Sequence, residues 1–455
     1  MLPLPRIKSV YVSAAPASLL MFMAGTSCCW SSPEIPKLLN ATTNPFERVV
    51  TEEEISWISS LLTLGAVTAP FLFGFLADKI GRKSTILLVG VPFFISYVML
   101  ATGEVIEVFY CARILSGIGV GGTFTMVPMY IGEIAESRNR GLISCLTGAI
   151  CSFGLLFSVA LGPFKTIQYF NTVLAIPPLL FLIIFSILSE ESPIYLIKNQ
   201  EIEQAESVLH NLGRTLEAAK KEILEIQSGY GNKEDTTINY KEMFRSKPFI
   251  KGTISSLGLL IFQQLSGINA IMFYSQTIFE QAGTKLAPQF CVIILVSVQF
   301  VSSFIVSFVV DRFGRKICLL ISAVGMIASN APLAIYCHLR SSQIYVESYS
   351  WIPVLTLTTF IIFFNFGYGP LPWTILAEMF STNYRSFAAA LVSTLCWLVS
   401  FWVTKYFGLA VATFGLGNVF LFSTFSCLLA AIFSSFYVIE TKGKSLNEIQ
   451  EMLDK

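Results

Sequence analysis

The sequence predicts an all-α membrane protein, with twelve spanning helices in two six-helix halves and short helices between the halves. Three observations favour this fold class. Of the 455 residues, 54% are hydrophobic and 13% are charged, whereas soluble domains carry about 25% charged residues. Apolar runs of roughly 20 residues, each long enough to cross a bilayer as a helix, recur along the chain. Polar phrases of the first half also return in the second half in the same order.

The apolar segments fall into two groups separated by one long polar interval. The first group covers residues 9–30, 56–77, 85–102, 106–130, 142–163 and 167–188. The second group covers residues 250–279, 288–310, 317–339, 352–377, 386–408 and 413–438. We therefore predict four parts: an N-terminal six-helix bundle over 1–188, a cytoplasmic helical linker over 189–249, a C-terminal six-helix bundle over 250–440 and a cytoplasmic tail over 441–455.

The polar interval contains signals for short helices. Ser192 and Pro193 are typical of the N-cap and first position of a helix. Amphipathic stretches follow at Ile202–Leu212 and Leu216–Ile226, with Glu and Lys spaced to pair along a helix face. We expect these helices to lie under the membrane domain; the alternative is a disordered linker.

The direction of insertion follows from Lys and Arg in the short loops. Loops on one side of the predicted bundle concentrate these cations, namely Lys79, Arg82, Lys83, Arg138, Arg140, Arg312, Arg315, Lys316 and Arg385. We therefore expect a multi-pass protein of the plasma membrane with both termini in the cytoplasm. The sequon Asn40-Ala41-Thr42 then lies on the far side, where Asn40 is a candidate glycosylation site. A single sequon can also arise by chance.

One charged phrase is written twice, as GFLADKIGRK at 74–83 and as SFVVDRFGRK at 307–316. In each half a Glu…Arg pair seven residues apart follows, and then a further Glu. Insertion bias explains the cations but not the acids placed identically twice, so we predict internal duplication and a two-state gate of ion pairs between helices. The candidate gate residues are Asp78, Arg82, Glu133, Arg140, Glu190, Asp311, Arg315, Glu378, Arg385 and Glu440.

Two apolar segments carry polar groups at membrane depth. QQLSGIN places Gln263, Gln264 and Asn269 in a spanning helix, where carboxamides are costly unless they face partners or a wet cavity. Carboxamides present the donors and acceptors that sugar hydroxyls require; the alternative interpretation is that they only join helices. GYGPLPW breaks another span beside Trp373, whose indole face suits a pyranose ring. Further candidates at membrane depth are Gln299 and Asn365.

Taken together, these phrases resemble the sugar porters of the major facilitator superfamily, which include glucose facilitators and insect facilitated trehalose transporters. The motifs cover essentially the whole chain: GFLADKIGRK, VPMYIGEIAESRNRG, SEESPIYL, QQLSGINAIMFYSQTIF, DRFGRK, GYGPLPWTILAEMF and ETKGKSL. The resemblance implies the major facilitator fold and transport of a hexose or trehalose by alternating access. It also implies that Gln263, Gln264, Asn269 and Trp373 hold the sugar. Tyr274 is included among the substrate-binding residues as part of the extracellular gate.

The chain departs from the family pattern at several positions. Glucose-type porters carry a binding Gln in span five, where this chain has Thr147 and Gly148. Cys396 stands where glucose facilitators have Asn, and Ile194 where Arg is usual. These departures put glucose itself in doubt, and the small residue at position 148 leaves room that would suit a disaccharide.

Span one bears on energy coupling. Proton-driven members of the family pair an Asp in span one with an Arg in span four. Arg113 is present, but the first span reads SLLMFMAGTSCCWSSP and contains no carboxylate. A proton carrier needs a titratable group at that depth, so we predict facilitated diffusion. The alternatives are a proton-coupled symporter that uses another carboxylate, and a non-transporting sugar sensor.

Other functional classes find no support in the sequence. It shows no Ser/His/Asp constellation, no phosphate loop and no cysteine cluster with metal spacing. The net charge is +1, and no basic patch suggests nucleic-acid binding. We expect a protein that is not an enzyme, holds no cofactor or metal, and functions as a monomer with a small neutral sugar and the lipid bilayer as its partners.

Overall fold

The computed structural model describes residues 9–46, 48–231, 240–343, 347–380, 384–442, 444 and 446–454. At residues 137, 138, 140, 228–231, 240, 241, 307–312, 347, 385, 446 and 447 it describes the backbone alone. Within this part of the chain, 12 helical segments are long and apolar enough to cross a membrane, and no strand is present. The predicted class and number of spans are confirmed.

The first six spans form one half of the molecule, the N half. Its elements are α1 (Val10–Cys29), α2 (Ser31–Leu39), α3 (Glu52–Ile80), α4 (Arg82–Thr102), α5 (Ile106–Ile134), α6 (Ser137–Leu161), the short 3₁₀ turn η1 (Gly162–Phe164) and α7 (Ile167–Leu188). Helices α1 and α2 together make the first span. Helix α5 packs against α3 and α4, and α1 packs against α6.

The second six spans form the C half. Its elements are α12 (Lys247–Leu265), α13 (Ile268–Ala282), α14 (Pro288–Phe313), α15 (Arg315–Ser341), the 3₁₀ turn η2 (Glu347–Tyr349), α16 (Ile352–Phe366), α17 (Leu371–Glu378), α18 (Arg385–Phe414) and α19 (Leu416–Phe436). Two spans are broken: α12 passes into α13 and α16 into α17. The first break is at Gly267, whose φ of 91° lies in the left-handed region that favours glycine.

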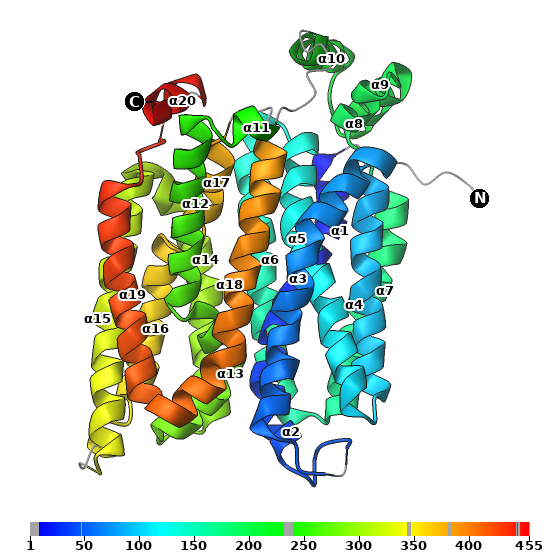
Figure 1. The fold of residues 1–455 in the computed structure, drawn as a ribbon. Helices are drawn as coiled ribbons and strands as arrows, with labels where there is room; N and C mark the ends of the chain where they lie inside the picture. Colours follow the sequence, from blue (N-terminus) through cyan, green and yellow to red (C-terminus); the bar gives the residue numbers. More distant parts are fainter. Residues whose placement is uncertain are drawn as a thin grey trace.

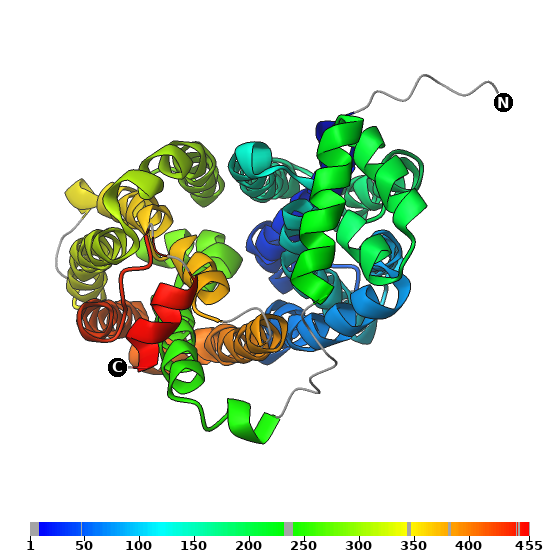
Figure 2. The ribbon, with the colours of Figure 1, turned by 90° about the horizontal axis from the view of Figure 1, so that it is seen from above.

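The two halves stand side by side, with α3 along α18 and α6 along α14 between them (Figures 1 and 2). Helices α8 (Pro193–Lys198), α9 (Ile202–Asn211), α10 (Leu216–Gly231) and α11 (Tyr240–Met243) lie at one end of the bundle, together with the C-terminal α20 (Leu446–Asp454) (Figure 1). We call this end the linker face. The opposite end, where α2 lies, we call the distal face.

The linker helices are anchored to the N half. Ser192 caps α8, since its side chain accepts a hydrogen bond from the backbone N–H of Tyr195. The buried Arg214 donates to the carbonyl oxygen of Ile134 at the end of α5, at 2.9 Å, and pairs with Glu222 at 3.4 Å. The described part of the interval is therefore helical and packed, as the capping and amphipathic signals predicted.

The repeated phrase forms the same turn in both halves. Gly81 and Gly314 each have a φ of 91° and each directly precedes a helix, α4 or α15. At both helix starts a carboxylate accepts hydrogen bonds from backbone N–H groups, as expected where the helix dipole favours negative charge. In the C half this carboxylate is Glu440, which lies 2.9 Å from the nitrogen of Arg315. This shared geometry supports internal duplication.

The corresponding carboxylate of the N half differs from the predicted residue. Glu191, not Glu190, accepts from the backbone nitrogens of Arg82 at 2.8 Å and Lys83 at 3.1 Å. The side chain of Glu190 instead accepts from Asn211 of α9 at 3.0 Å. The side chains of these two adjacent acids point in different directions, so only one of them reaches the turn. The predicted equivalence of Glu190 with Glu440 was therefore wrong by one position: Glu191 is the counterpart of Glu440.

Candidate functional site

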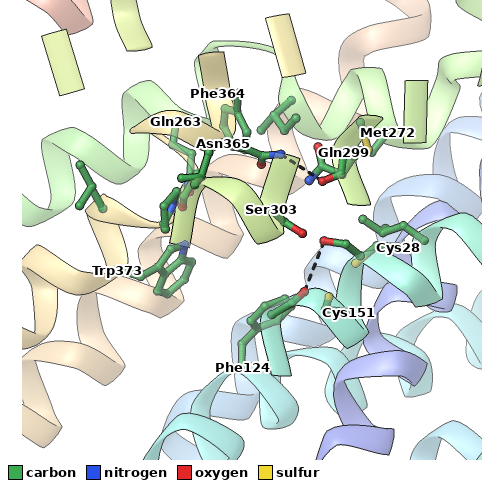
Figure 3. Close-up of a pocket in the computed structure, with 18 of the residues that line it drawn as sticks. Cys28, Phe124, Cys151, Gln263, Met272, Gln299, Ser303, Phe364, Asn365 and Trp373 are labelled. Carbon is green, nitrogen blue, oxygen red and sulfur yellow. Dashed lines mark hydrogen bonds between the residues drawn. The ribbon is translucent and has the colours of Figure 1, made fainter. Parts of the chain in front are cut away.

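A cavity of about 520 Å³ lies between the two halves. Its lining extends from Asn269 and Met272 on α13 to Arg315 at the start of α15, and so reaches the linker face. Both halves contribute to the wall: Figure 3 shows Gln263, Asn365, Gln299 and Trp373 across the cavity from Cys28, Cys151 and Phe124. This arrangement brings together the predicted substrate residues Gln263, Gln264, Asn269, Gln299, Asn365 and Trp373.

The carboxamides of the C-half wall form a hydrogen-bonded network. Gln263 Nε2 donates to the carbonyl oxygens of Tyr368 and Gly369 at 2.6 and 3.0 Å, which satisfies backbone freed by the break between α16 and α17. Gln264 Oε1 accepts from Asn269 Nδ2 at 2.6 Å. The N–H groups of these residues therefore join helices, which was the alternative interpretation of them, while the same residues also line the cavity.

Free acceptor capacity remains on this wall. Asn365 Nδ2 donates to Ser302 Oγ at 2.6 Å. Gln299 Oε1 is buried and has no hydrogen-bond partner among the residues that the structure describes. A buried unpaired acceptor is costly. Trp373, half-buried at the start of α17, adds an aromatic surface to the same wall.

The N-half wall is made mostly of small and sulfur-containing side chains, with Phe124 and Leu155 beside them. Its lining residues on α6 are Ser144, Cys145, Gly148, Ala149, Cys151, Ser152 and Leu155. Their recurrence at three- and four-residue spacing marks one helix face, a signal in the sequence that could have identified this wall. A Cβ atom placed at Gly148 would meet no heavy atom within 4 Å. The space next to Gly148 is therefore open, as the size of that residue led us to expect.

At the distal face the halves are in contact. Ser31 Oγ of α2 donates to the carbonyl oxygen of Phe273 at 3.0 Å, and Ser32 Oγ lies 3.3 Å from Ser275 Oγ. These bonds join α2 of the N half to α13 of the C half, and α13 separates the cavity from a second hollow on the distal side. The cavity is therefore closed at the distal face and reaches the linker face.

Tyr274 does not line the cavity, contrary to its inclusion among the substrate-binding residues. It lines the second hollow, a distal vestibule of about 1250 Å³, and donates from its hydroxyl to the carbonyl oxygen of Thr404 at 3.2 Å. The backbone of α13 is kinked at Tyr274, with φ −118° and ψ 17°, while Met272 faces the cavity. Its distal position agrees with the predicted gate role.

The charged residues of the repeat form one cluster in each half at the linker face. Arg82 Nε lies 2.9 Å from Glu133 Oε2, and Arg82 Nη1 donates to the carbonyl oxygen of Ala77 at 2.9 Å and to Asp78 at 3.3 Å. The hydroxyl of Ser192 also donates to Glu133. This cluster is largely buried, since the side chains of Arg82 and Glu133 are 6% and 11% exposed.

The cluster of the C half is more open. Arg315 Nη2 lies 3.2 Å from Glu378 Oε1, with the two side chains 15% and 28% exposed. The hydroxyl of Thr441 donates to Glu378. Each of these ion pairs joins elements of the same half. The side chains of Arg140, Asp311 and Arg385 lie outside the described part of the structure.

Arg113 is fully buried in span four. Its Nε donates to the carbonyl oxygen of Ile58 and its Nη1 to that of Ser27, both at 3.0 Å. The guanidinium carbon lies 5.0 Å from the ring centroid of Trp30. Arg113 therefore binds backbone carbonyls of α1 and α3, and holds these helices against α5.

Comparisons with known proteins agree with this architecture. The chain is 33% identical over 409 residues to the facilitated trehalose transporter Tret1 of Bombyx mori, a match that covers 89% of this chain and 80% of the relative. It is 30% identical to Tret1 of Polypedilum vanderplanki, over 99% of this chain and 90% of the relative.

Solved structures share the fold. The proton:xylose symporter XylE bound to 6-bromo-6-deoxy-D-glucose matches with a TM-score of 0.79 at 24% identity, covering 98% of this chain and all of that one. The inward-open conformation of XylE from E. coli matches with a TM-score of 0.80 at 24% identity, over 97% and 99% of the two chains. The model of the sugar (and other) transporter family matches residues 14–453, so the chain belongs to that family.

Proposed function

We propose that this protein carries a small neutral sugar, a hexose or trehalose, across a membrane by alternating access and without an energy source. The cavity is the observation that supports this most directly. It lies between two duplicated halves, has carboxamides and an indole on one wall, reaches one face and is closed at the other. Membership of a transporter family and relatives named for trehalose transport support the same proposal.

We infer that the linker face is cytoplasmic, because the cation-rich short loops lie there, and that the membrane is the plasma membrane. The conformation described is then inward-facing. When the halves rock so that the cavity opens to the distal face, the linker-face ends of the halves approach each other. The arginine and glutamate clusters, including Arg140 and Arg385, then hold that face shut by pairing across the halves. A single chain supplies both walls, so we propose that a monomer suffices.

The environment of Arg113 supports passive transport. Its guanidinium is bound by two backbone carbonyls rather than by a carboxylate. None of the described residues that line the cavity is an Asp or Glu. A proton carried with the sugar would need such a group.

Tracer flux tests the proposal. The purified protein is reconstituted into proteoliposomes, and entry of labelled trehalose and labelled glucose is measured with and without an imposed proton gradient. We expect saturable downhill entry of at least one sugar at the same rate in both conditions. Absence of entry for every neutral sugar offered would refute sugar transport, and entry only under the gradient would refute the passive mechanism.

One observation favours proton coupling as a second candidate. Glu34 lies on α2 and so within the first span, which extends beyond the predicted residues 9–30; the expectation that this span contains no carboxylate was therefore wrong. Glu34 is fully buried, pairs with Lys37 and has one oxygen, Oε2, without a hydrogen-bond partner in the described structure. A proton at Glu34 could accompany the sugar if the Lys37 pair opened with the distal face. The Glu34→Gln variant separates the two candidates, because it would abolish gradient-driven accumulation while leaving passive flux intact.

We also propose that Asn40 carries a glycan. Its side chain is exposed at the distal face, and Asn40 Oδ1 accepts a hydrogen bond from the hydroxyl of Thr42 at 2.8 Å. Treatment with an N-glycosidase should increase the gel mobility of the wild-type protein and leave the Asn40→Gln variant unchanged. An unchanged wild-type band would contradict the glycan.

A further inference from the structure

Lys405 is a cation within a spanning helix, and its contacts cross from one half of the molecule to the other. It lies on α18 of the C half, in the segment 386–414 that is long and apolar enough to span the membrane. Its Nζ donates to Ser56 Oγ at 2.7 Å and lies 3.8 Å from the ring centroid of Trp57. Both partners belong to α3 of the N half.

The position of this contact decides what it does. Ser56 and Trp57 lie in the first turns of α3, at the distal face, and all three residues line the distal vestibule. A lysine in a spanning helix is costly unless the ammonium has partners or water. Here it has a hydroxyl acceptor, an indole face and the water-accessible vestibule, so the charge is satisfied in this conformation by residues of the opposite half.

The surrounding contacts couple Lys405 to the helix that closes the cavity. The neighbouring Thr404 accepts the hydrogen bond from Tyr274 of α13, and Thr404 Oγ1 lies 3.4 Å from Thr63 Oγ1 of α3. Helix α13 lies between the two hollows, since Met272 lines the cavity and Tyr274 lines the vestibule. Lys405 and Thr404 thus contact α3 of the N half, and Thr404 also contacts Tyr274 of the C half. We call this group of contacts the distal seam.

We propose that Lys405 is a state-determining residue for transport: its contact with Ser56 and Trp57 is a latch that holds the distal face closed. This inference rests on the proposed alternating-access mechanism. If the halves separate at the distal face, the ammonium must leave the indole face and the hydroxyl. The contact therefore stabilises one conformation and not the other, which is the requirement for shifting a two-state equilibrium.

The other explanation of Lys405 is an interfacial lysine that stays in vestibule water and contributes nothing to the equilibrium. The two explanations make different predictions. A partly solvated cation–π contact together with a hydrogen bond from the ammonium shifts a two-state equilibrium by about tenfold. A solvated lysine would be exchangeable for any residue that keeps the helix intact.

Hydrogen–deuterium exchange on the full-length protein in lipid nanodiscs tests the latch independently of transport. We expect Lys405→Met to increase exchange by about tenfold in peptides from the distal ends of α2 and α13, because exchange there follows the population of the open form. Lys405→Arg and Trp57→Phe, which keep a cation or a ring, should remain near wild type. Trp57→Leu should reproduce Lys405→Met, and the double variant should add little.

Thr394→Val is the matched control. Thr394 also lies on α18 and donates to α3, at the carbonyl oxygen of Val67, 3.2 Å away, but nearer the linker face. This variant removes one inter-half hydrogen bond of the same two helices without touching the distal seam. We expect its distal-face exchange to match the wild type.

The latch proposal and the transport proposal can be refuted separately. Unchanged distal exchange in Lys405→Met, or equal effects of Lys405→Met and Lys405→Arg, would overturn the latch even if the protein transports sugar. Exchange that rises as expected in a protein that moves no sugar in proteoliposomes would overturn sugar transport and leave a latch between two conformations.

Discussion

The N half and the C half are alike at the linker face and different along the cavity. Each half repeats a left-handed glycine turn, a carboxylate on the following helix start and an arginine–glutamate pair. Along the cavity, the polar side chains of the C half include carboxamides and Trp373, whereas those of the N half are confined to Ser and Cys, beside Gly148 and apolar residues.

This difference separates two tasks of a duplicated chain. In the proposed mechanism, the parts that fix helix ends and bring the halves together at the linker face have to be equivalent, because both halves make the same movement. The parts that bind a small asymmetric molecule are free to diverge, since one wall can supply most hydrogen bonds and the other can set the space available. The two charge clusters differ in burial, and this difference allows a quantitative test of how closely the two halves correspond.

The largest expected effect is on stability and concerns the two arginines. Arg82→Ala leaves Glu133 in a largely buried site without its cation, and loss of one partner of a buried pair costs about 3–5 kcal/mol. Arg315→Ala should cost clearly less, because that pair is more exposed. Thermal unfolding of the purified variants in one detergent measures the order.

Asp78→Asn is the control for charge alone, since the Asp78 side chain is 56% exposed. An exposed ion pair contributes about 0–1 kcal/mol, so this variant should unfold close to wild type. Equal losses of stability for Arg82→Ala and Arg315→Ala would show that the two clusters contribute equally to stability despite their different burial.

The second prediction compares the two walls of the cavity. Gln264→Ala removes the acceptor of Asn269 Nδ2 and the donor to Cys396 Sγ. If Gln264 also holds the sugar, its loss leaves a sugar hydroxyl unpaired in the cavity at a cost of about 1–3 kcal/mol, so sugar uptake, measured as kcat/KM, should fall roughly 5- to 100-fold. Ser152→Ala on the opposite wall should change uptake much less. Uptake is normalised to the amount of protein in the membrane, and a wild-type rate for Gln264→Ala would mean that this network is purely structural.

The sequence predicted the parts of the molecule that follow from periodic or repeated patterns. Hydropathy predicted the spans, and the two copies of the charged phrase predicted equivalent turns at Gly81 and Gly314. It could not select Glu191 over Glu190, because the two acids are adjacent and identical in chemistry. They differ only in the direction in which their side chains point, and this direction depends on the local backbone. It also placed Tyr274 with the binding residues, since the kink that points this side chain to the vestibule leaves no mark in the residue pattern.

The N-half wall was only partly predictable for a different physical reason. Ser, Cys and Gly are common in spanning helices, where they let neighbouring helices approach closely. Gly148 stood out only through the family pattern, and its open surroundings become visible only when α6 is placed against the C half. Small side chains that line a cavity and small side chains that pack against a helix look the same in one sequence.

The third prediction uses that open space. Gly148→Leu fills volume in which a Cβ meets no neighbour, so the protein should fold normally. If the space accommodates the second ring of a disaccharide, trehalose uptake should fall several-fold while hexose uptake stays near wild type. Gly148→Ala should have a smaller effect in the same direction. Equal reduction for both sugars would show that the N-half wall does not select substrate length.

The smallest expected effect distinguishes the two carboxylates at the helix starts by their pH response. Burial raises the pKa of Glu191 above its ordinary value of 4.5, although the backbone N–H groups of Ser192, Lys83 and Arg82 oppose the rise. Partial burial also acts to raise the pKa of Glu440, but the N–H groups of Arg315, Lys442 and Lys316 outweigh it, and the pKa is lowered. The N–H groups thus favour the charged carboxylate in both halves, but they outweigh burial only at Glu440.

The signs of the two effects on stability are opposite. Glu440 stabilises the fold above the ordinary carboxyl pKa, and this contribution is lost as pH falls through its lowered value. For Glu191 the contribution is present below the ordinary pKa and is lost as pH rises through its raised value. Melting temperatures across the acidic range should therefore show the wild type losing its advantage over Glu440→Gln as pH falls, and gaining relative to Glu191→Gln. Parallel curves for the two variants would mean that the halves are equivalent in charge as well as in geometry.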